Sequence, residues 1–177
     1  MMPMSRKARH FWPLLLTLFL ADCATKDLVV EKLGVDSAPQ PVIDSLVRFN
    51  LAYNPGTAFS FDLRPYLGDG ARWVMIGLII VLIGALIQLY RRMSGRSRVA
   101  GIALGLACGG ALGNLYDRLR FPAGVVDFID VGIGVHRFYV FNVADAGITI
   151  GAVLLRLLFL REDGVLAPDI GRRADAP

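Results

Sequence analysis

Two aspartates lie in apolar surroundings where an ionised carboxylate is costly. Asp127 belongs to the segment VVDFID, and Asp145 lies just inside a long apolar stretch with no basic residue within one helical turn. Two carboxyl groups that approach each other in a low-dielectric site cannot both ionise cheaply, so they hold one shared proton near neutral pH. One then takes a proton from water while the other protonates the attacked carbonyl, which is aspartic protease chemistry. Structural ion pairs and proton relays are the alternatives.

Asp130 is a rival to Asp127 as a member of this pair. Residues three apart in a strand face opposite sides, so Asp127 and Asp130 should point in different directions. The pattern by itself does not decide which of the two faces a site.

Other polar residues lie within or at the ends of apolar stretches, where charged groups mark function by default. Asp22 and Lys26 are four residues apart, so they are adjacent on one helix face and can form an ion pair. The remaining residues of this kind are Asn114, Asp117, Arg118 and Asn142. If the helices alternate in direction, all of these groups lie toward the same outer face of a membrane.

The elements that must position these groups are membrane helices. The 177 residues are 55% hydrophobic and only 19% charged, with a mean hydropathy of +0.54, whereas soluble domains contain about 25% charged residues. Long apolar runs cover residues 73–90, 99–116 and 138–160. At about 1.5 Å per residue each run approaches the roughly 30 Å thickness of the hydrocarbon layer. We therefore expect three spans here.

The stretch LLLTLFLADCATKDLVV, residues 14–30, has two incompatible interpretations. A basic N-terminus precedes it and LADC looks like a lipoprotein cleavage site before Cys23, which would indicate a secretory signal. However, Asp22 is not the small residue that such cleavage requires, and it can pair with Lys26 in a retained helix. We predict retention. The basic 91–98 link is then cytoplasmic, which places both termini in the cytoplasm.

These expectations give one domain over residues 1–162, an all-α integral membrane protein with four transmembrane helices and a small β-rich extracytoplasmic platform. The platform comes from loops at about 34–70 and 120–138, which contain alternating, aromatic-rich segments typical of strands. Asn54-Pro-Gly in the first loop predicts a turn. The polar tail, residues 163–177, is predicted to be cytoplasmic and disordered.

Glycines recur every fourth residue from 101 to 113. Such a row lets another helix approach closely. Packing explains Gly101 and Gly105, whereas Gly109, Gly110 and Gly113 lie at the polar end, where close backbone approach would also admit a substrate.

Composition also bounds the partners. The net charge of +4 comes from basic residues at the predicted cytoplasmic ends, so we expect anionic lipid head groups rather than nucleic acid as partners. Cys23 and Cys108 are predicted to be free thiols within spans. His10 and His136 lie too far apart in this topology for a metal site. No metal, other cofactor or oligomer is indicated.

Five sequence blocks together resemble the signature of the lipoprotein signal peptidase, or signal peptidase II, family. They are DCATK, YNPGTAFSF, GGALGNLYDRL, VVDFID and FNVADAGITIG, in the family's order, and they cover about Asp22 to Gly151. The resemblance implies an intramembrane aspartic endopeptidase of the bacterial inner membrane, with its active site at the outer, periplasmic face. It would cut a diacylglyceryl-modified prolipoprotein before the lipidated cysteine.

The resemblance also implies residue roles. Asp127 and Asp145 match the catalytic pair, which resolves the choice between Asp127 and Asp130. The other matching positions, expected to contact the substrate backbone or support the site, are Asp22, Lys26, Asn54, Gly110, Asn114, Arg118 and Asn142; among them Asn114 and Arg118 are the expected substrate contacts. In the first block Cys23 replaces the family's usual glutamine, which lies outside the pair.

Two other functions use similar features. A proton-coupled transporter also needs intramembrane acids, but such sites usually lie near the midplane between repeats, and the sequence shows no repeat. A membrane scaffold or assembly factor would use the outer loops as docking surfaces, and it predicts that Asp127→Asn leaves function intact.

Overall fold

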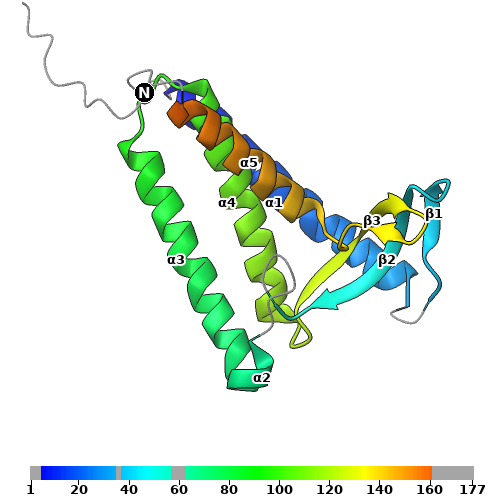
Figure 1. Ribbon diagram of the computed structural model, residues 1–177. Helices are drawn as coiled ribbons and strands as arrows, with labels where there is room; N and C mark the ends of the chain where they lie inside the picture. The colour runs from blue at the N-terminus through cyan, green and yellow to red at the C-terminus, as the bar shows by residue number, and fades with distance from the viewer. Residues whose placement is uncertain (1–4, 35–36, 57–62, 161–177) are drawn as a thin grey trace, which may run out of the picture.

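The structure, a computed structural model, describes residues 5–34, 37–56 and 63–160; the tail 163–177 lies outside this range. The elements follow in the order α1 (Arg6–Lys32), β1 (Gln40–Ile43), β2 (Val47–Asn54), α2 (Arg64–Leu67), α3 (Gly70–Arg92), α4 (Arg98–Arg120), β3 (Val125–Ile133), β4 (His136–Arg137) and α5 (Val143–Leu160). Four long helices lie side by side, and a small sheet projects from one end of them (Figure 1).

Three of the described helices, α3, α4 and α5, are long and apolar enough to span a membrane, as the three apolar runs predicted. The apolar run that predicted the last span, 138–160, is longer than its helix. Residues 138–142 are not helical, and Phe141 pairs with Ile129 of β3 instead. Aromatic residues favour strands as much as helices, so this aromatic stretch joins the sheet and α5 begins only at Val143.

Helix α4 is the centre of the helical layer, because α1 and α5 both approach its backbone closely. A Cβ atom added to Gly105 or Gly109 would lie 2.7 Å from the carbonyl oxygen of Phe11 or Leu15 of α1. On the α5 side, Gly110 lies against the Ala144 carbonyl. The predicted helix contact along the glycine row is confirmed. Neighbouring helices fill the space at its polar end, so the idea that a substrate enters there is wrong.

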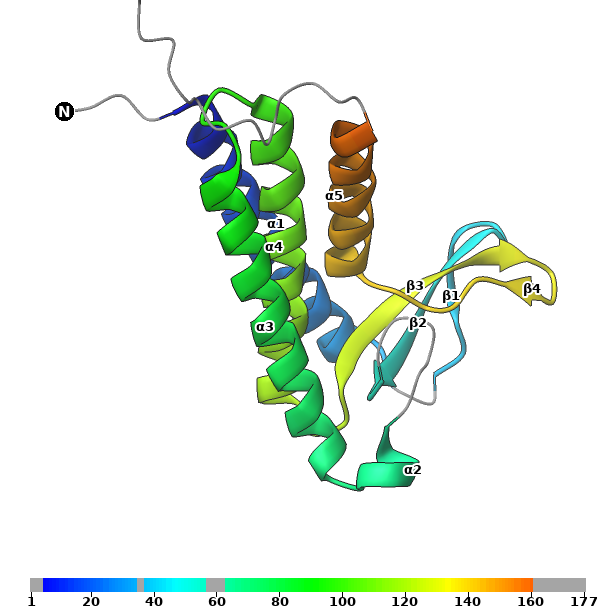
Figure 2. The same cartoon turned by 60° about the vertical axis from the view of Figure 1, so that its left-hand side comes forward.

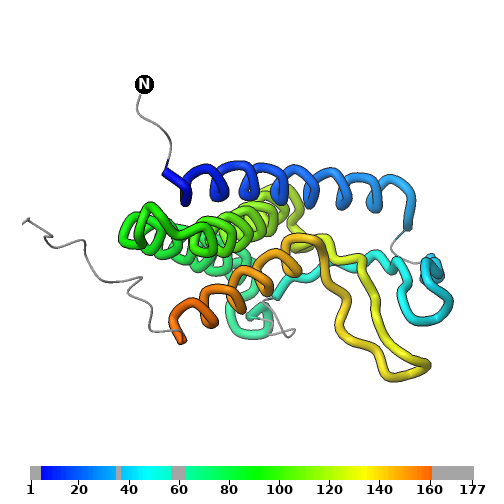
Figure 3. The backbone as a smooth tube through the Cα atoms, turned by 90° about the horizontal axis from the view of Figure 1, so that it is seen from above, coloured from blue at the N-terminus to red at the C-terminus, as the bar shows by residue number. Residues whose placement is uncertain are grey.

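Helices α1 and α5 run in opposite directions beside α4. Contacts advance together along α1 and α4, from Lys7 beside Gly101 to Asp22 beside Gly113, so these two helices are parallel. Helix α5 runs the opposite way, because Ala144 lies near Gly110 while Gly151 meets Ala103. Seen from above, α1 runs beside α4 and the sheet lies beyond the end of the helices that is distant from the N-terminus (Figure 3).

The strands form one antiparallel sheet in the order β1-β2-β3-β4, which extends sideways from the helices (Figure 2). Strands in both predicted loops are confirmed, whereas β1 and α2 were not anticipated. Ala52 of β2 faces Asp127 of β3, and Arg48 faces Asp130, with a register shift between them. The sheet thus carries Asp127 to the point where β3 meets the helices.

We expect Gly105→Ala to lower the thermal unfolding temperature in detergent. The added methyl group would overlap the α1 backbone, and overpacking of this kind costs about 1–3 kcal/mol. Gly84→Ala on α3 is the matched control, because nothing lies within 4 Å of a Cβ at that position. Equal unfolding temperatures for the two variants would contradict the close α1–α4 contact.

Candidate active site

Asn142 connects the two predicted catalytic aspartates. Its side-chain Nδ2 donates to Asp127 Oδ1 at 2.6 Å, and its Oδ1 accepts from the Asp145 backbone N–H at 2.9 Å. Its own backbone N–H donates to Asp145 Oδ2 at 3.2 Å. These reciprocal bonds form a capping box at the start of α5. The same asparagine therefore begins the helix, fixes Asp145 and reaches across to Asp127.

Asp127 is only 2% exposed and is surrounded by amide donors. Its second oxygen accepts from Asn54 Nδ2 at 3.0 Å, while Asn54 Oδ1 accepts from the Gly56 backbone N–H at 3.0 Å. The Asn54 side chain thus holds the backbone directly after β2, and the rest of the predicted turn lies outside the described residues. Burial and then the charge of Asp145 raise the pKa of Asp127 to about 7, although hydrogen bonds from the two asparagines oppose the shift. Asp127 can therefore carry a proton near neutral pH.

Asp145 is half-buried at the first turn of α5. Its Oδ1 accepts from Asn114 Nδ2 of α4 at 2.8 Å. The Asn114 oxygen in turn accepts from Lys26 Nζ at 3.0 Å and from Asn142 Nδ2 at 3.2 Å. Because both donors contact the amide oxygen, the amide nitrogen faces Asp145.

The predicted pair of Asp22 and Lys26 is confirmed, with Lys26 Nζ 2.7 Å from Asp22 Oδ2. A second acid, Asp117 of α4, lies 3.0 Å from the same nitrogen. All three side chains are at most 2% exposed. Burial of an unpaired charge is strongly unfavourable, and each of the two acids contacts the lysine directly in one buried cluster.

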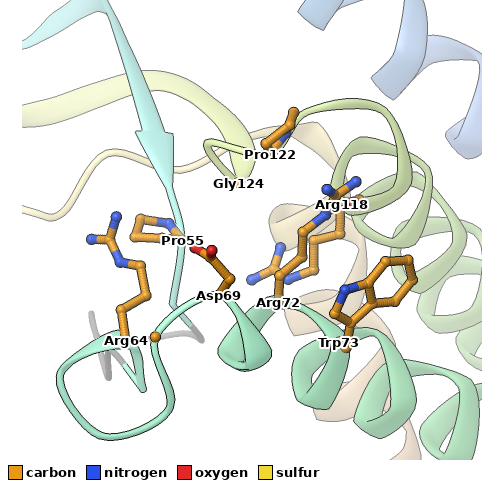
Figure 4. A pocket seen from close by; sticks show the side chains of 9 residues that line it. Pro55, Arg64, Asp69, Arg72, Trp73, Arg118, Pro122 and Gly124 are labelled. Carbon is orange, nitrogen blue, oxygen red and sulfur yellow. Dashed lines mark hydrogen bonds between the residues drawn. The ribbon is translucent and has the colours of Figure 1, made fainter.

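Arg118 lies beside this network, close enough for its charge to interact with Asp127 and Asp145. Its guanidinium donates to the Gly56 carbonyl, and its backbone carbonyl accepts from Arg72 of α3 at 2.8 Å. Figure 4 shows Arg118 at the wall of a pocket of about 380 Å³. The lining residues are Pro55, Arg64, Gly68, Asp69, Arg72, Trp73, Arg118, Pro122 and Gly124. Among the predicted site residues, Gly110 is the one without a side chain, and its role is to let α5 pack closely against α4.

Comparison with known proteins assigns the family. The sequence profile described as "Signal peptidase (SPase) II" matches residues 14–161. The chain belongs to the signal peptidase II family. The lipoprotein signal peptidase of Ectopseudomonas mendocina is 40% identical over 168 residues, covering 92% of this chain and 95% of the relative. That of Geobacillus kaustophilus is 34% identical over 146 residues, covering 82% and 89%.

A solved structure supports the fold. A bacterial membrane enzyme determined by the in meso method at 2.3 Å resolution superposes with a TM-score of 0.78 at 23% identity, covering 100% of this chain and 99% of that chain. Together with the family profile, this makes the chain an aspartic peptidase of the signal peptidase II family embedded in a bacterial membrane.

In this signal peptidase II chain, Asp127 and its rival Asp130 have different hydrogen-bond partners. Asp130 accepts from Arg48 Nη2 at 2.6 Å and from Arg137 Nε at 2.8 Å. Burial by itself would raise the pKa of Asp130, but the hydrogen bonds from Arg137 and Arg48 outweigh it and leave the pKa below the ordinary value. Asp130 is therefore an ionised group that joins the strands, on the side of the sheet away from the asparagine network.

Sequence reasoning missed two residues that shape this site. Asp117 was noted but was not assigned a role, although it lies three residues after Asn114 and so on the same helix face. Gly124 has a φ of +121°, and a side chain there would meet the Asn54 carbonyl. In the sequence, the only indication of this role was that a glycine stands immediately before VVDFID. Asp117 fixes the start of β3 against α4 by accepting from Val126. Gly124 lets the chain before β3 pass close to Asn54.

The raised pKa of Asp127 predicts a pH-dependent stability difference. The protonated form is favoured in the folded state, so this contribution is complete below the ordinary pKa of 3.8 and is lost as pH rises through about 7. Asp127→Asn lacks the titrating group. We therefore expect its free energy of unfolding, relative to that of wild type, to increase by on the order of 1–4 kcal/mol from pH 5 to pH 8. Thermal unfolding in detergent across this range measures the difference. A constant difference would contradict the shift.

Proposed function

We propose that this protein removes the signal peptide from diacylglyceryl-modified prolipoproteins by cleaving the bond before the lipidated cysteine, with Asp127 and Asp145 as its catalytic pair. The observation that carries this proposal is the contact of both carboxyl groups with Asn142 in a chain of the signal peptidase II family. Named relatives are lipoprotein signal peptidases. A proton-coupled transporter is not favoured, because the family is one of peptidases.

The two aspartates differ in a way that assigns them complementary roles. Asp127 is almost fully buried and its pKa is raised to about 7, so it supplies a proton to the scissile carbonyl oxygen. Asp145 is half-buried, so water reaches it and gives it a proton as the water oxygen attacks the carbonyl carbon. Collapse of the tetrahedral diol breaks the C–N bond and the departing amine takes the proton from Asp145. A hydroxyl proton of the diol returns to Asp127, so the products are a carboxylic acid and an amine and both aspartates regain their starting protonation states.

Asn114 and Arg118 are the proposed contacts to the substrate backbone. Asn114 lies beside Asp145 through its amide nitrogen. Arg118 borders the pocket and contacts the turn after Asn54. An extended substrate peptide can also add to an exposed sheet edge, and β1 is exposed at all four positions.

We also infer that α1 is a fourth span and that the pair lies at the outer face. Helix α1 runs parallel to α4 over at least 15 residues, from Lys7 to Asp22. The 91–98 link joins the opposite ends of α3 and α4 from the aspartates and carries four arginines, which favours a cytoplasmic location. The acyl chains of a lipidated substrate hold its cysteine at the membrane surface, where a water-using pair must act.

Asp127→Asn and Asp145→Asn should each abolish cleavage of a diacylated prolipoprotein, by at least about 1000-fold, since each removes a proton donor or acceptor that the reaction requires. The measurement is signal-peptide release in detergent by purified protein, with lipidated and unlipidated substrate side by side. Asp130→Asn is the matched control, because this acid is in the same strand but is held by arginines.

Two results would overturn the proposal. Turnover by either mutant of the pair would refute the assigned catalysis, provided the mutants elute as folded protein on size exclusion. Equal cleavage of unlipidated substrate by wild type would refute the proposed specificity.

A further inference from the structure

Lys26 joins helices α1 and α4, which lie far apart in the sequence. It belongs to α1, and its ammonium group contacts Asp22 of the same helix and both Asn114 and Asp117 of α4. Its side chain is 1% exposed. Each of these three partners leads onward to a residue at or beside one of the two aspartates.

Each of the two acids beside Lys26 accepts a hydrogen bond from the residue that precedes one aspartate of the pair. Asp117 Oδ2 accepts from the Val126 backbone N–H at 3.0 Å, and Asp22 Oδ1 accepts from the Ala144 backbone N–H at 2.8 Å. Val126 immediately precedes Asp127, and Ala144 immediately precedes Asp145. The same lysine thus fixes the residue before each member of the pair.

Charge and geometry explain why a cation is required between these acids. Asp22 and Asp117 are buried in the helical layer, and two such carboxylates near each other repel and lose hydration. Lys26 lies between the two and reduces their repulsion, while each acid also accepts from a backbone N–H. Its third bond, to the Asn114 oxygen, turns the Asn114 amide toward Asp145.

We propose that Lys26 is a positioning residue for the aspartate pair, acting through Asp22 and Asp117 on the backbone before each aspartate and through Asn114 on Asp145. The proposal rests on the catalytic pair of the proposed function and adds how the spacing of that pair is set. Loss of Lys26 displaces the reacting groups and, of the proposed substrate contacts, disturbs Asn114, whereas Arg118 and the β1 edge stay in place. The rate of the bound complex then falls more than substrate affinity.

The first test compares two buried lysines of α1. Lys26→Met should lower kcat about 100-fold while KM changes less than about threefold, since small displacements of reacting groups cost about this much. Lys7→Met is the matched control. Lys7 donates to the Tyr90 and Met93 carbonyls at the other end of the helix, so its loss should reduce folded yield without changing kcat per folded molecule.

The second test separates hydrogen-bond acceptance from charge and does not depend on the folding of the lysine variant. Asp117→Asn retains an oxygen for the Val126 N–H, whereas Asp117→Leu does not. We expect kcat of the asparagine variant to stay within about tenfold of wild type and that of the leucine variant to fall about 100-fold. Equal kcat for the two variants would overturn the proposal.

Asp127→Asn in the same assay distinguishes the possible failures. If Asp127→Asn is inactive and Lys26→Met has the kcat of wild type, the positioning role is wrong and the catalytic pair stands. If Asp127→Asn turns over substrate, the pair itself is wrong and the positioning role is wrong with it. A fall in kcat that is equal for Lys26→Met and Lys7→Met would show a structural role only.

Discussion

A charged amine inside a bundle of apolar helices must be surrounded by acids and amides, because an unpaired charge there is strongly unfavourable. Lys26 is such an amine, and the residues that surround it also position the site. Helix α4 must approach α1 closely enough for Asp117 and Asn114 to reach the ammonium group. The row of glycines permits that approach, since a side chain at Gly101, Gly105 or Gly109 would collide with the α1 backbone. Helix packing and the charge cluster therefore depend on each other.

The aspartate pair is assembled where a strand and a helix meet. Asp127 is in β3 and Asp145 in α5, with the β4 hairpin between them in the chain. Asn142 joins them by capping α5 with one part of its amide and contacting Asp127 with the other. A helix start is a fixed point in a fold, because its first N–H groups need partners. Placing Asp145 three residues after the cap makes its position a consequence of helix formation.

Local patterns in the sequence predicted what depends on local chemistry. Hydropathy located α3 and α4, alternation located β2 and β3, and helical spacing paired Asp22 with Lys26. Tertiary contacts decided the rest. Strand β1 is exposed at every position, so it has no alternation to detect. Asp117 and Gly124 matter because β3 packs against the end of α4, a contact between elements that local patterns do not reveal. The choice between Asp127 and Asp130 required the resemblance to a family.

The contrast between Asp127 and Asp130 shows how one strand holds two carboxylates for different purposes. Asp130 is bound by two arginines, and a permanent cation beside a carboxylate keeps it ionised. Asp127 is bound by two asparagines, whose neutral N–H groups donate to a carboxyl oxygen in either protonation state. Asparagine also separates Lys26 from Asp145, through Asn114. The cation thus orients the acids of the pair without direct contact, and this leaves a proton free to move between them and a substrate.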